Sequence, residues 1–147
     1  MASSEPPVAQ ECVEGYLFVR AGPRLLLFRR PPGRDRIWVP VSGKVDPGDR
    51  DLDSALRREL AEETGLVAAH GLLPLDWHVR FDGPDGRPWR LHAYGVELDR
   101  EETPRLSAEH EAFAWVDPAE AIRRLHYEDN REAVSRLLHV LGGSPKV

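Results

Sequence analysis

The sequence predicts an α/β (α+β) fold, an α/β/α sandwich in which helices cover both faces of a mixed β-sheet. Leu25 to Phe28 form an uninterrupted apolar run, which is typical of a strand that is covered on both faces. Two segments have helical patterns, one that ends at Gly65 and one from Glu128 to Leu141, and β-capable runs lie before and between them. Strands that alternate with helices in this way indicate a sheet with helices packed on it.

Three strands are predicted in the first part of the chain. Val13 to Arg20 and Arg24 to Arg30 are apolar runs joined by a short Gly-Pro turn, which predicts a hairpin. Residues 31–35 contain two prolines and a glycine and predict a loop. Ile37 to Val41 is then a short strand that leads into Ser42-Gly43.

The first helix is predicted from its two ends. It begins near Asp51 or Asp53, which are favourable N-cap residues. It ends at Gly65, because glycine takes the left-handed conformation of a C-terminal cap without strain.

The second half of the chain predicts three strands and two helices. Leu72 to Phe81 and Trp89 to Leu98 are strands joined by a turn, and Ala112 to Val116 is the last strand. Asp117-Pro118 starts a short helix, with Asp as the N-cap and Pro at the first helical position. Four strand aromatics are candidates to stack on a base, although strand aromatics are usually core residues: Trp77, Phe81, Trp89 and Tyr94.

Length and composition limit the class of protein. The 147 residues suit one domain, so we expect a disordered leader over residues 1–10 and a single domain over residues 11–147. The one cysteine excludes an internal disulfide framework and a thiolate metal site. No apolar run approaches the roughly 20 residues of a membrane span, and the polar leader is no signal peptide. We therefore expect a soluble cytoplasmic protein with no membrane partner.

The charges are distributed unevenly along the chain. The net charge of −5 gives no electrostatic reason to expect a nucleic-acid partner. Between Arg20 and Lys44, however, seven cations accompany a single acid, Asp35. Because a phosphate chain bridged by metal ions needs both signs of charge, this stretch beside an acidic helix suggests phosphate binding. Arg30, Arg36 and Lys44 are the candidates, and a charged sheet edge is the alternative.

Three carboxylates lie on or next to the apolar face of the predicted first helix. At about 100° per residue, Glu63 falls between Leu52 and Leu56. Glu59 falls beside Leu52, and Glu62 lies next to Glu59. Two of the three occupy the last turn, where the helix dipole disfavours negative charge. The cluster therefore favours a hard cation with oxygen ligands, Mg²⁺ or Mn²⁺, and the alternative is an ordinary solvated acidic face.

The stretch from Gly43 to Leu66 resembles the Nudix box. That pattern has a glycine, a later glutamate, and then Arg-Glu-hydrophobic-any-Glu-Glu-any-Gly-hydrophobic. Gly43 matches the first glycine, and residues 58–66, which read Arg-Glu-Leu-Ala-Glu-Glu-Thr-Gly-Leu, match the second half at every position. Residues 37–45, 109–117 and 130–133 are similar to the Nudix enzymes that cleave dihydroneopterin triphosphate, deoxynucleoside triphosphates or diadenosine tetraphosphate.

The resemblance implies the Nudix fold and a Mg²⁺-dependent hydrolase. Its substrate would be a small nucleotide-type diphosphate, either a nucleoside triphosphate or another nucleoside diphosphate linked to a second moiety, cleaved at a phosphoanhydride bond. We expect a monomer or homodimer. The metal ligands that it implies, for Mg²⁺ with Mn²⁺ as a substitute, are the Gly43 carbonyl, Glu59, Glu62 and Glu63. The catalytic residues that it implies are Arg58, which orients a neighbouring Glu, and Glu62 or Glu109 as proton acceptor, with Glu111 in reserve.

Two features depart from the box. Asp49 stands where the box has its first glutamate, and eight residues separate it from Arg58, one more than in the box. A shorter, displaced carboxylate predicts a weaker contact with its partner. The alternative function is therefore a catalytically weakened Nudix-fold module that binds or senses a nucleotide. A third possibility is a plain interaction domain whose acidic helix is only solvated.

Overall fold

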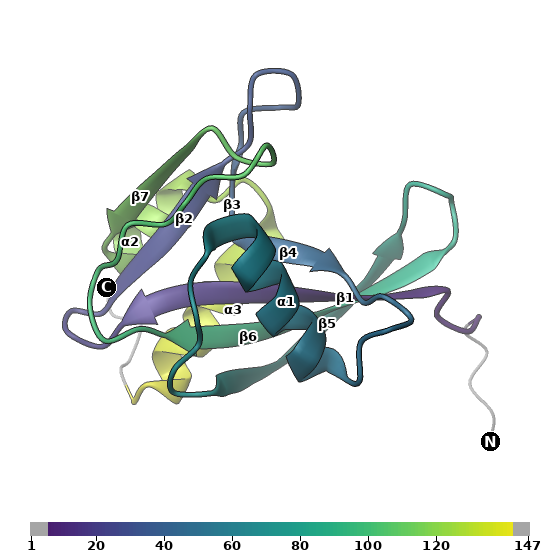
Figure 1. Cartoon of the computed structure of the whole chain (residues 1–147), viewed down its shortest axis with the longest axis horizontal. Coiled ribbons are helices and arrows are strands. Elements are labelled where there is room, and N and C mark those ends of the chain that lie inside the picture. Colours follow the sequence, from purple (N-terminus) through teal and green to yellow (C-terminus); the bar gives the residue numbers. More distant parts are fainter. Residues whose placement is uncertain (1–5, 143–147) are drawn as a thin grey trace.

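The computed structural model describes residues 6–142, in which seven strands form one mixed β-sheet with helices on both faces (Figure 1). The main row of strands runs β3-β2-β1-β6-β5, while β4 pairs with β1 and β7 pairs with β2. β1 and β6 are parallel, and the other pairs are antiparallel. The predicted sandwich around a mixed sheet is thus confirmed. In chain order the elements are β1 (Gln10–Val19), β2 (Arg24–Arg29), β3 (Trp38–Val39), β4 (Val41–Lys44), α1 (Leu52–Thr64), β5 (Leu72–Asp82), β6 (Pro88–Glu97), β7 (Ala112–Val116), α2 (Pro118–Arg124) and α3 (Glu128–Val140).

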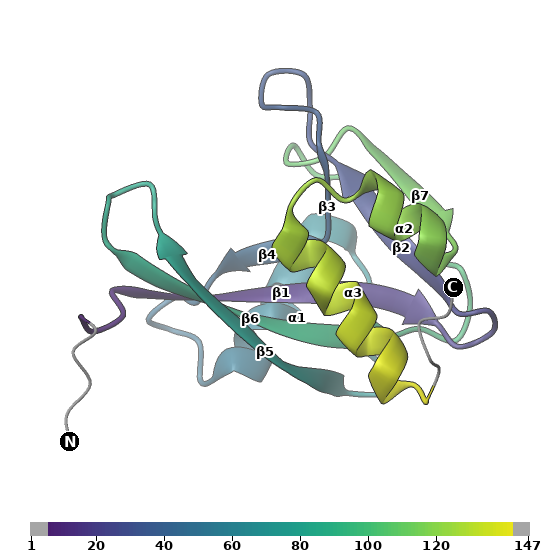
Figure 2. The ribbon, with the colours of Figure 1, turned by 180° about the vertical axis from the view of Figure 1, so that it is seen from behind.

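β1 is the central strand. Along one edge its first half pairs with β4 and its second half with β2, while β6 pairs along the whole of the other edge. Every residue from Cys12 to Val19 is buried. α1 lies over one face of the strand (Figure 1), and α3 crosses the opposite face (Figure 2). Both faces of this strand are covered, which accounts for the largely apolar sequence of residues 12–19, where Glu14 is the exception.

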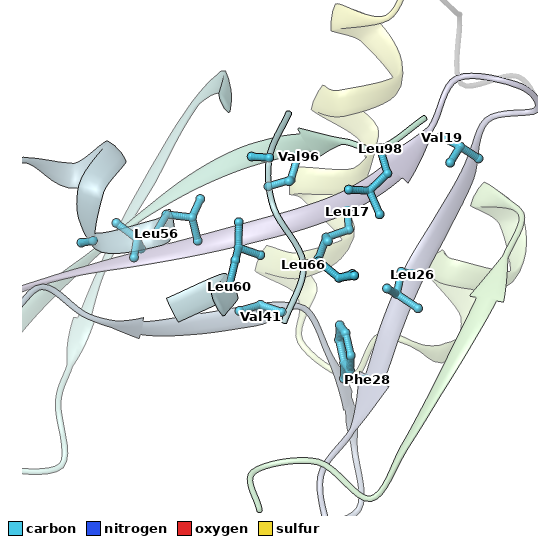
Figure 3. Packing of buried hydrophobic residues seen from close by; sticks show 13 residues of the cluster. Leu17, Val19, Leu26, Phe28, Val41, Leu56, Leu60, Leu66, Val96 and Leu98 are labelled. Atoms are coloured by element: carbon cyan, nitrogen blue, oxygen red, sulfur yellow. The ribbon is translucent and has the colours of Figure 1, made fainter. Parts of the chain in front are cut away.

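Two hydrophobic cores fill the space on either side of the sheet. On the α1 side, Leu56 and Leu60 pack over β1 together with Leu17 (Figure 3). On the α3 side, Val134 and Leu137 belong to the other cluster. The apolar run of β2 serves both cores, since Leu26 and Phe28 join the first and Leu25 and Leu27 the second. The prediction of a strand covered on both faces is confirmed.

The predicted helix ends are confirmed as well. The Asp51 side chain accepts a hydrogen bond from the Ser54 N–H at the start of α1, and Gly65 ends the helix with φ of 72°. Asp117 caps α2 in the same way, accepting from the Glu120 N–H. α1 and α3 have 13 residues each. Within residues 6–142 no helix is both long and apolar enough to cross a membrane.

Two predicted boundaries are wrong. The expected strand Ile37 to Val41 is divided into β3 and β4 by Pro40, because proline has no N–H to donate to a sheet. Gln10, expected in a disordered leader, is the first residue of β1 and pairs with Trp89. Of the rest of that leader, residues 1–5 lie outside the described residues, and the Ala9 N–H donates to the Pro88 carbonyl at 2.7 Å.

A buried polar cluster joins β1 to α3. The Tyr16 hydroxyl donates to the Glu14 carboxylate at 2.5 Å. Asn130 Nδ2 donates to the same carboxylate at 3.2 Å and to the Tyr16 oxygen at 2.9 Å. Burial raises the pKa of Glu14 to about 7, and the two hydrogen bonds to the carboxylate only partly oppose this effect. Glu14 is therefore partly protonated near neutral pH.

We expect Glu14→Gln to remove a pH dependence from the stability of the protein. The folded-state pKa of about 7 lies above the ordinary 4.5, so the folded protein retains a proton that the unfolded chain releases between these pH values. The free energy of unfolding of the native protein must therefore fall as pH rises through this range. Gln imitates the protonated carboxyl and does not titrate. The variant should gain roughly 2 to 3 kcal/mol relative to the native protein between pH 5 and pH 8.

Urea denaturation at each pH measures this difference, in which the titration of every other group cancels. A difference between the two proteins that stays constant from pH 5 to pH 8 would contradict the prediction.

Candidate active site

The carboxylate of Glu59 lies directly against the backbone at Gly43. α1 packs on β4 and brings the two residues together (Figure 1). A Cβ at Gly43 would come within 2.1 Å of the Glu59 carboxyl carbon, so no side chain fits at this position. Burial is the main cause that raises the pKa of Glu59 to about 7, Arg58 opposes it, and the neighbouring carboxylates of Glu62 and Glu63 add to the rise.

Arg58 is the cation among these carboxylates. Its Nε and Nη2 donate to the two carboxylate oxygens of Asp49 at 3.0 and 2.8 Å. Its Nη1 donates to Glu59 at 3.3 Å and to Glu62 at 3.2 Å, and Nη2 also donates to the Lys44 carbonyl at 3.0 Å. The Arg58 guanidinium holds the pKa of Asp49 down at about 2. One side chain thus links β4, the loop before α1 and the exposed end of the carboxylate cluster.

The inserted residue does not keep Asp49 from its partner. Asp49 accepts a hydrogen bond from the Asp46 N–H at 2.7 Å, and its own N–H donates to the Asp46 carbonyl at 2.9 Å. This turn takes up the extra residue before the helix cap at Asp51 and presents both carboxylate oxygens to Arg58. The expectation of a weakened contact is wrong.

The helical positions of the three glutamates agree with the predicted pattern. The Glu59 and Glu63 side chains are 12% and 16% exposed, whereas Glu62 is 56% exposed. Two carboxylates therefore lie at the edge of the apolar face, and the third extends into solvent beside them.

Glu63 faces the segment that precedes β7. Ser107 Oγ donates to Glu63 Oε2 at 2.6 Å. His110 Nδ1 lies 3.9 Å from the same oxygen, and burial lowers the pKa of this histidine to about 4. The ring is therefore neutral and forms no ion pair with Glu63. Arg105 Nη2 donates to the Ala61 carbonyl at 3.1 Å and brings positive charge to the C-terminal end of α1, which has no basic residue in its last turn.

A cavity of about 420 Å³ opens beside Gly43. Two of the predicted phosphate-binding residues, Arg30 and Lys44, line it together with the buried Glu14 and Asn130. Asn130 Oδ1 is buried and has no hydrogen-bond partner among the described residues. The cavity thus combines cations with buried polar groups.

Aromatic rings also line this cavity. Trp89 and Phe81, two of the four candidates for base stacking, contribute from β6 and β5, and Lys44 Nζ lies 5.8 Å from the centre of the Trp89 ring. Tyr127 lies where α3 begins, with the Arg30 guanidinium 6.0 Å from its ring centre. The other two candidates pack instead against the hydrophobic cores: Trp77 and Tyr94.

Other predicted residues lie outside the lining of this cavity. Arg36 Nε is 3.2 Å from Glu111, which also pairs with Arg29 at 2.8 Å. Glu109 is 59% exposed, and its carboxylate is 3.8 Å from Arg34. Glu111, predicted as the reserve candidate for proton acceptor, is therefore engaged in two ion pairs, whereas the Glu109 side chain is largely exposed to solvent.

The donor groups at the end of α1 fit a hard divalent cation in their chemistry. Glu59, Glu62 and Glu63 offer carboxylate oxygens, and the close approach at Gly43 sets a carboxylate against a peptide unit. Within residues 6–142, no three Asp, Glu, His or Cys side chains already converge on one metal position. Arg58 instead holds two of the carboxylates, and Ser107 holds the third.

Sequence reasoning missed the roles of Ser107 and Glu14. A serine in a polar segment has no local pattern, and its partner Glu63 lies 44 residues away in the chain. Glu14 did carry a signal, because a charged residue that interrupts an apolar strand must find buried partners.

The family model for the NUDIX domain matches residues 13–137. The chain is 37% identical over 116 residues to an octanoyltransferase from Myxococcus xanthus, in a match that covers 77% of this chain and 32% of that protein. The chain therefore spans about a third of the length of this relative. It is 31% identical over 116 residues to the asymmetrical bis(5'-nucleosyl)-tetraphosphatase from Rattus norvegicus, with 74% of each protein covered.

The fold is similar to that of a solved structure, an Ap4A hydrolase binary complex from C. elegans. The TM-score is 0.76 at 22% identity, and the match covers 91% of this chain and 98% of the other. At this identity the likeness shows the fold alone. The match to the NUDIX model over most of the chain, together with the tetraphosphatase relative, shows the family. This chain belongs to the Nudix hydrolase family.

Proposed function

We propose that the protein is a Mg²⁺-dependent pyrophosphohydrolase. It cleaves a phosphoanhydride bond in a nucleoside triphosphate or in another nucleoside diphosphate linked to a second moiety. The observation that carries this proposal is the Glu59 carboxylate seated against Gly43, with Glu62 and Glu63 on the same end of α1 and a cation-lined cavity alongside. The rat relative, whose name describes a bis(5'-nucleosyl)-tetraphosphatase, supports a nucleotide substrate.

The cavity suits a phosphorylated nucleoside. Arg30 and Lys44 line it and can neutralise phosphate oxygens. Trp89 and Tyr127 offer aromatic surface to a base. Arg36 is less suited to bind the phosphates, since Glu111 already engages it outside the lining.

Bound Mg²⁺ would neutralise the phosphate oxygens and acidify the attacking water. We assign the Gly43 carbonyl, Glu59, Glu62 and Glu63 to hold it. Arg58 orients Glu59 and Glu62 through charge-assisted hydrogen bonds, and Asp49 fixes Arg58 in turn.

The proton acceptor is Glu62 or Glu109. Both side chains are more than half exposed, so water can reach both carboxylates.

The alternative is a weakened module that binds or senses a nucleotide. It rested on the shorter Asp49 and the inserted residue. The bidentate contact of Asp49 with Arg58 removes that argument. The release of orthophosphate, pyrophosphate or nucleoside monophosphate separates the two functions. The substrate panel comprises nucleoside triphosphates, dinucleoside polyphosphates, nucleotide sugars and dihydroneopterin triphosphate, each with Mg²⁺ and with chelator. Thermal stabilisation by these compounds without any turnover would favour the module.

We expect Glu63→Gln to lose most Mg²⁺-dependent hydrolysis while the metal-free protein stays equally stable or becomes more stable. A neutral amide holds a hard cation poorly, so the rate should fall by about 100-fold or more. Its oxygen can still accept the Ser107 hydrogen bond, and the loss of one charge relieves repulsion between the carboxylates. Initial rates, together with thermal unfolding in chelator and in Mg²⁺, measure both effects.

Glu132→Gln is the matched control, because Glu132 pairs with Arg136 on the surface of α3. Retained hydrolysis and unchanged stabilisation by Mg²⁺ in Glu63→Gln would sink the assignment of Glu63 as a metal ligand.

We expect Asp49→Asn to lower kcat by about 10-fold, because an amide cannot keep the bidentate ion pair that orients Arg58. Asp53→Asn is the control, since Asp53 forms its ion pair with Arg57, one helical turn further along α1, and not with Arg58. Steady-state kinetics of the two variants measure the change in kcat that tests this prediction. Equal kcat values in both would show that Asp49 has no orienting role.

A further inference from the structure

The segment before β7 is attached to the last turn of α1. The Arg105 N–H donates to the Thr64 carbonyl at 2.9 Å, and the Arg105 guanidinium donates to the Ala61 carbonyl at 3.1 Å. Two residues later, Ser107 Oγ donates to Glu63 at 2.6 Å. Three hydrogen bonds thus set this segment against the end of the helix that carries the carboxylates.

The hydroxyl of Ser107 makes hydrogen bonds on both sides. Its O–H donates a hydrogen bond to Glu63 Oε2, and its oxygen accepts a hydrogen bond from the Glu109 N–H at 3.1 Å. The Ser107 oxygen therefore joins two groups. One is the carboxylate of Glu63, which we assign to metal binding, and the other is the backbone of Glu109, a proposed proton acceptor. Hydrogen bonds in such a chain polarise and orient one another.

The neighbouring His110 and Arg34 do not hold Glu63 and Glu109 in the way that Ser107 does. His110 Nδ1 is 3.9 Å from Glu63 Oε2, too far for a hydrogen bond, and this nitrogen has no hydrogen-bond partner within residues 6–142. The imidazole ring lies against Phe28, with ring centres 4.9 Å apart, and anchors the segment in the core. The carboxylate of Glu109 meets Arg34 only at 3.8 Å, where both side chains are exposed and the attraction is weak. The backbone of Glu109, held by Ser107, is therefore fixed more firmly than its side chain.

We propose that Ser107 is a positioning residue that orients Glu63 for Mg²⁺ and couples metal binding to the place of Glu109. This inference rests on the proposed function. With one Glu63 oxygen held by Ser107, the other is left for the cation. Because the same hydroxyl receives the Glu109 amide, a cation that draws on the Glu63 carboxylate also affects the loop that carries Glu109.

Ser107→Ala and Ser107→Thr test the proposal in the full-length protein, because Thr keeps the hydroxyl and Ala removes it. Ser135→Ala is the control, since Ser135 lies on α3, which covers the opposite face of the sheet (Figure 2). Titration with Mn²⁺ alone measures metal affinity, amide exchange by NMR in metal-free protein measures protection of the Glu109 N–H, and kinetics give kcat and KM.

We expect Ser107→Ala to bind Mn²⁺ about 10-fold more weakly, to lose the protection of the Glu109 amide and to lower kcat about 10-fold with KM nearly unchanged. Ser107→Thr should restore all three. Native affinity and native Glu109 protection in Ser107→Ala would overturn the inference, as would equal losses in the Ala and Thr variants. A native protein without metal-dependent hydrolysis would contradict the proposed function itself, whereas an active native protein with an unaffected Ser107→Ala variant would overturn only this inference.

Discussion

The contacts of Arg58 make an otherwise unfavourable helix end possible. Any two carboxylates about 6 Å apart would repel each other by roughly 3 kcal/mol at an effective dielectric near 20. α1 carries Glu59, Glu62 and Glu63 near its C-terminal end, with no basic residue in its last turn. Arg58 bonds Glu59 and Glu62 directly and is itself held by Asp49. Because this compensation comes from the protein, the helix end can form before any cation arrives. A metal ion bound as proposed would compete with Arg58 for the carboxylate oxygens of Glu59 and Glu62.

The cavity beside this cluster depends on an irregularity in the sheet. β2 pairs with the second half of β1 and β4 with the first half, and Pro40 lies at the change from one to the other. Val39, Pro40 and Ser42, around this change, all line the cavity. An unbroken strand would have continued the ladder and carried Gly43 along one regular edge. The break that was missing from the sequence-based prediction therefore contributes part of the cavity lining.

Local rules predicted what local physics decides. The caps of α1 and α2, the first hairpin, the doubly covered β2 and the positions of Glu59 and Glu63 follow from residue type and spacing, and the structure agrees with each. The remaining features depend on how distant segments meet. The reach of Asp49 depends on a turn closed at Asp46, and the contact of Ser107 with Glu63 depends on the docking of a loop 44 residues further along the chain. No pattern within either segment contains that information.

The position of β1 in the chain has a consequence for how the protein is made. β1, at the centre of the sheet, precedes the other described strands in the chain, and its parallel partner β6 pairs Gln10 with Trp89 and Phe18 with Glu97. The hairpin with β2 can form early, since its partners are only a few residues apart. The other edge of β1 can pair only after β6 has been synthesised. The apolar face that α3 covers can be buried only after residues 128–140 have been synthesised. Long-range parallel pairing is intrinsically slow to form, and unpaired apolar strands favour aggregation. A growing chain therefore leaves this edge of β1 unpaired until residues 88–97 have left the ribosome.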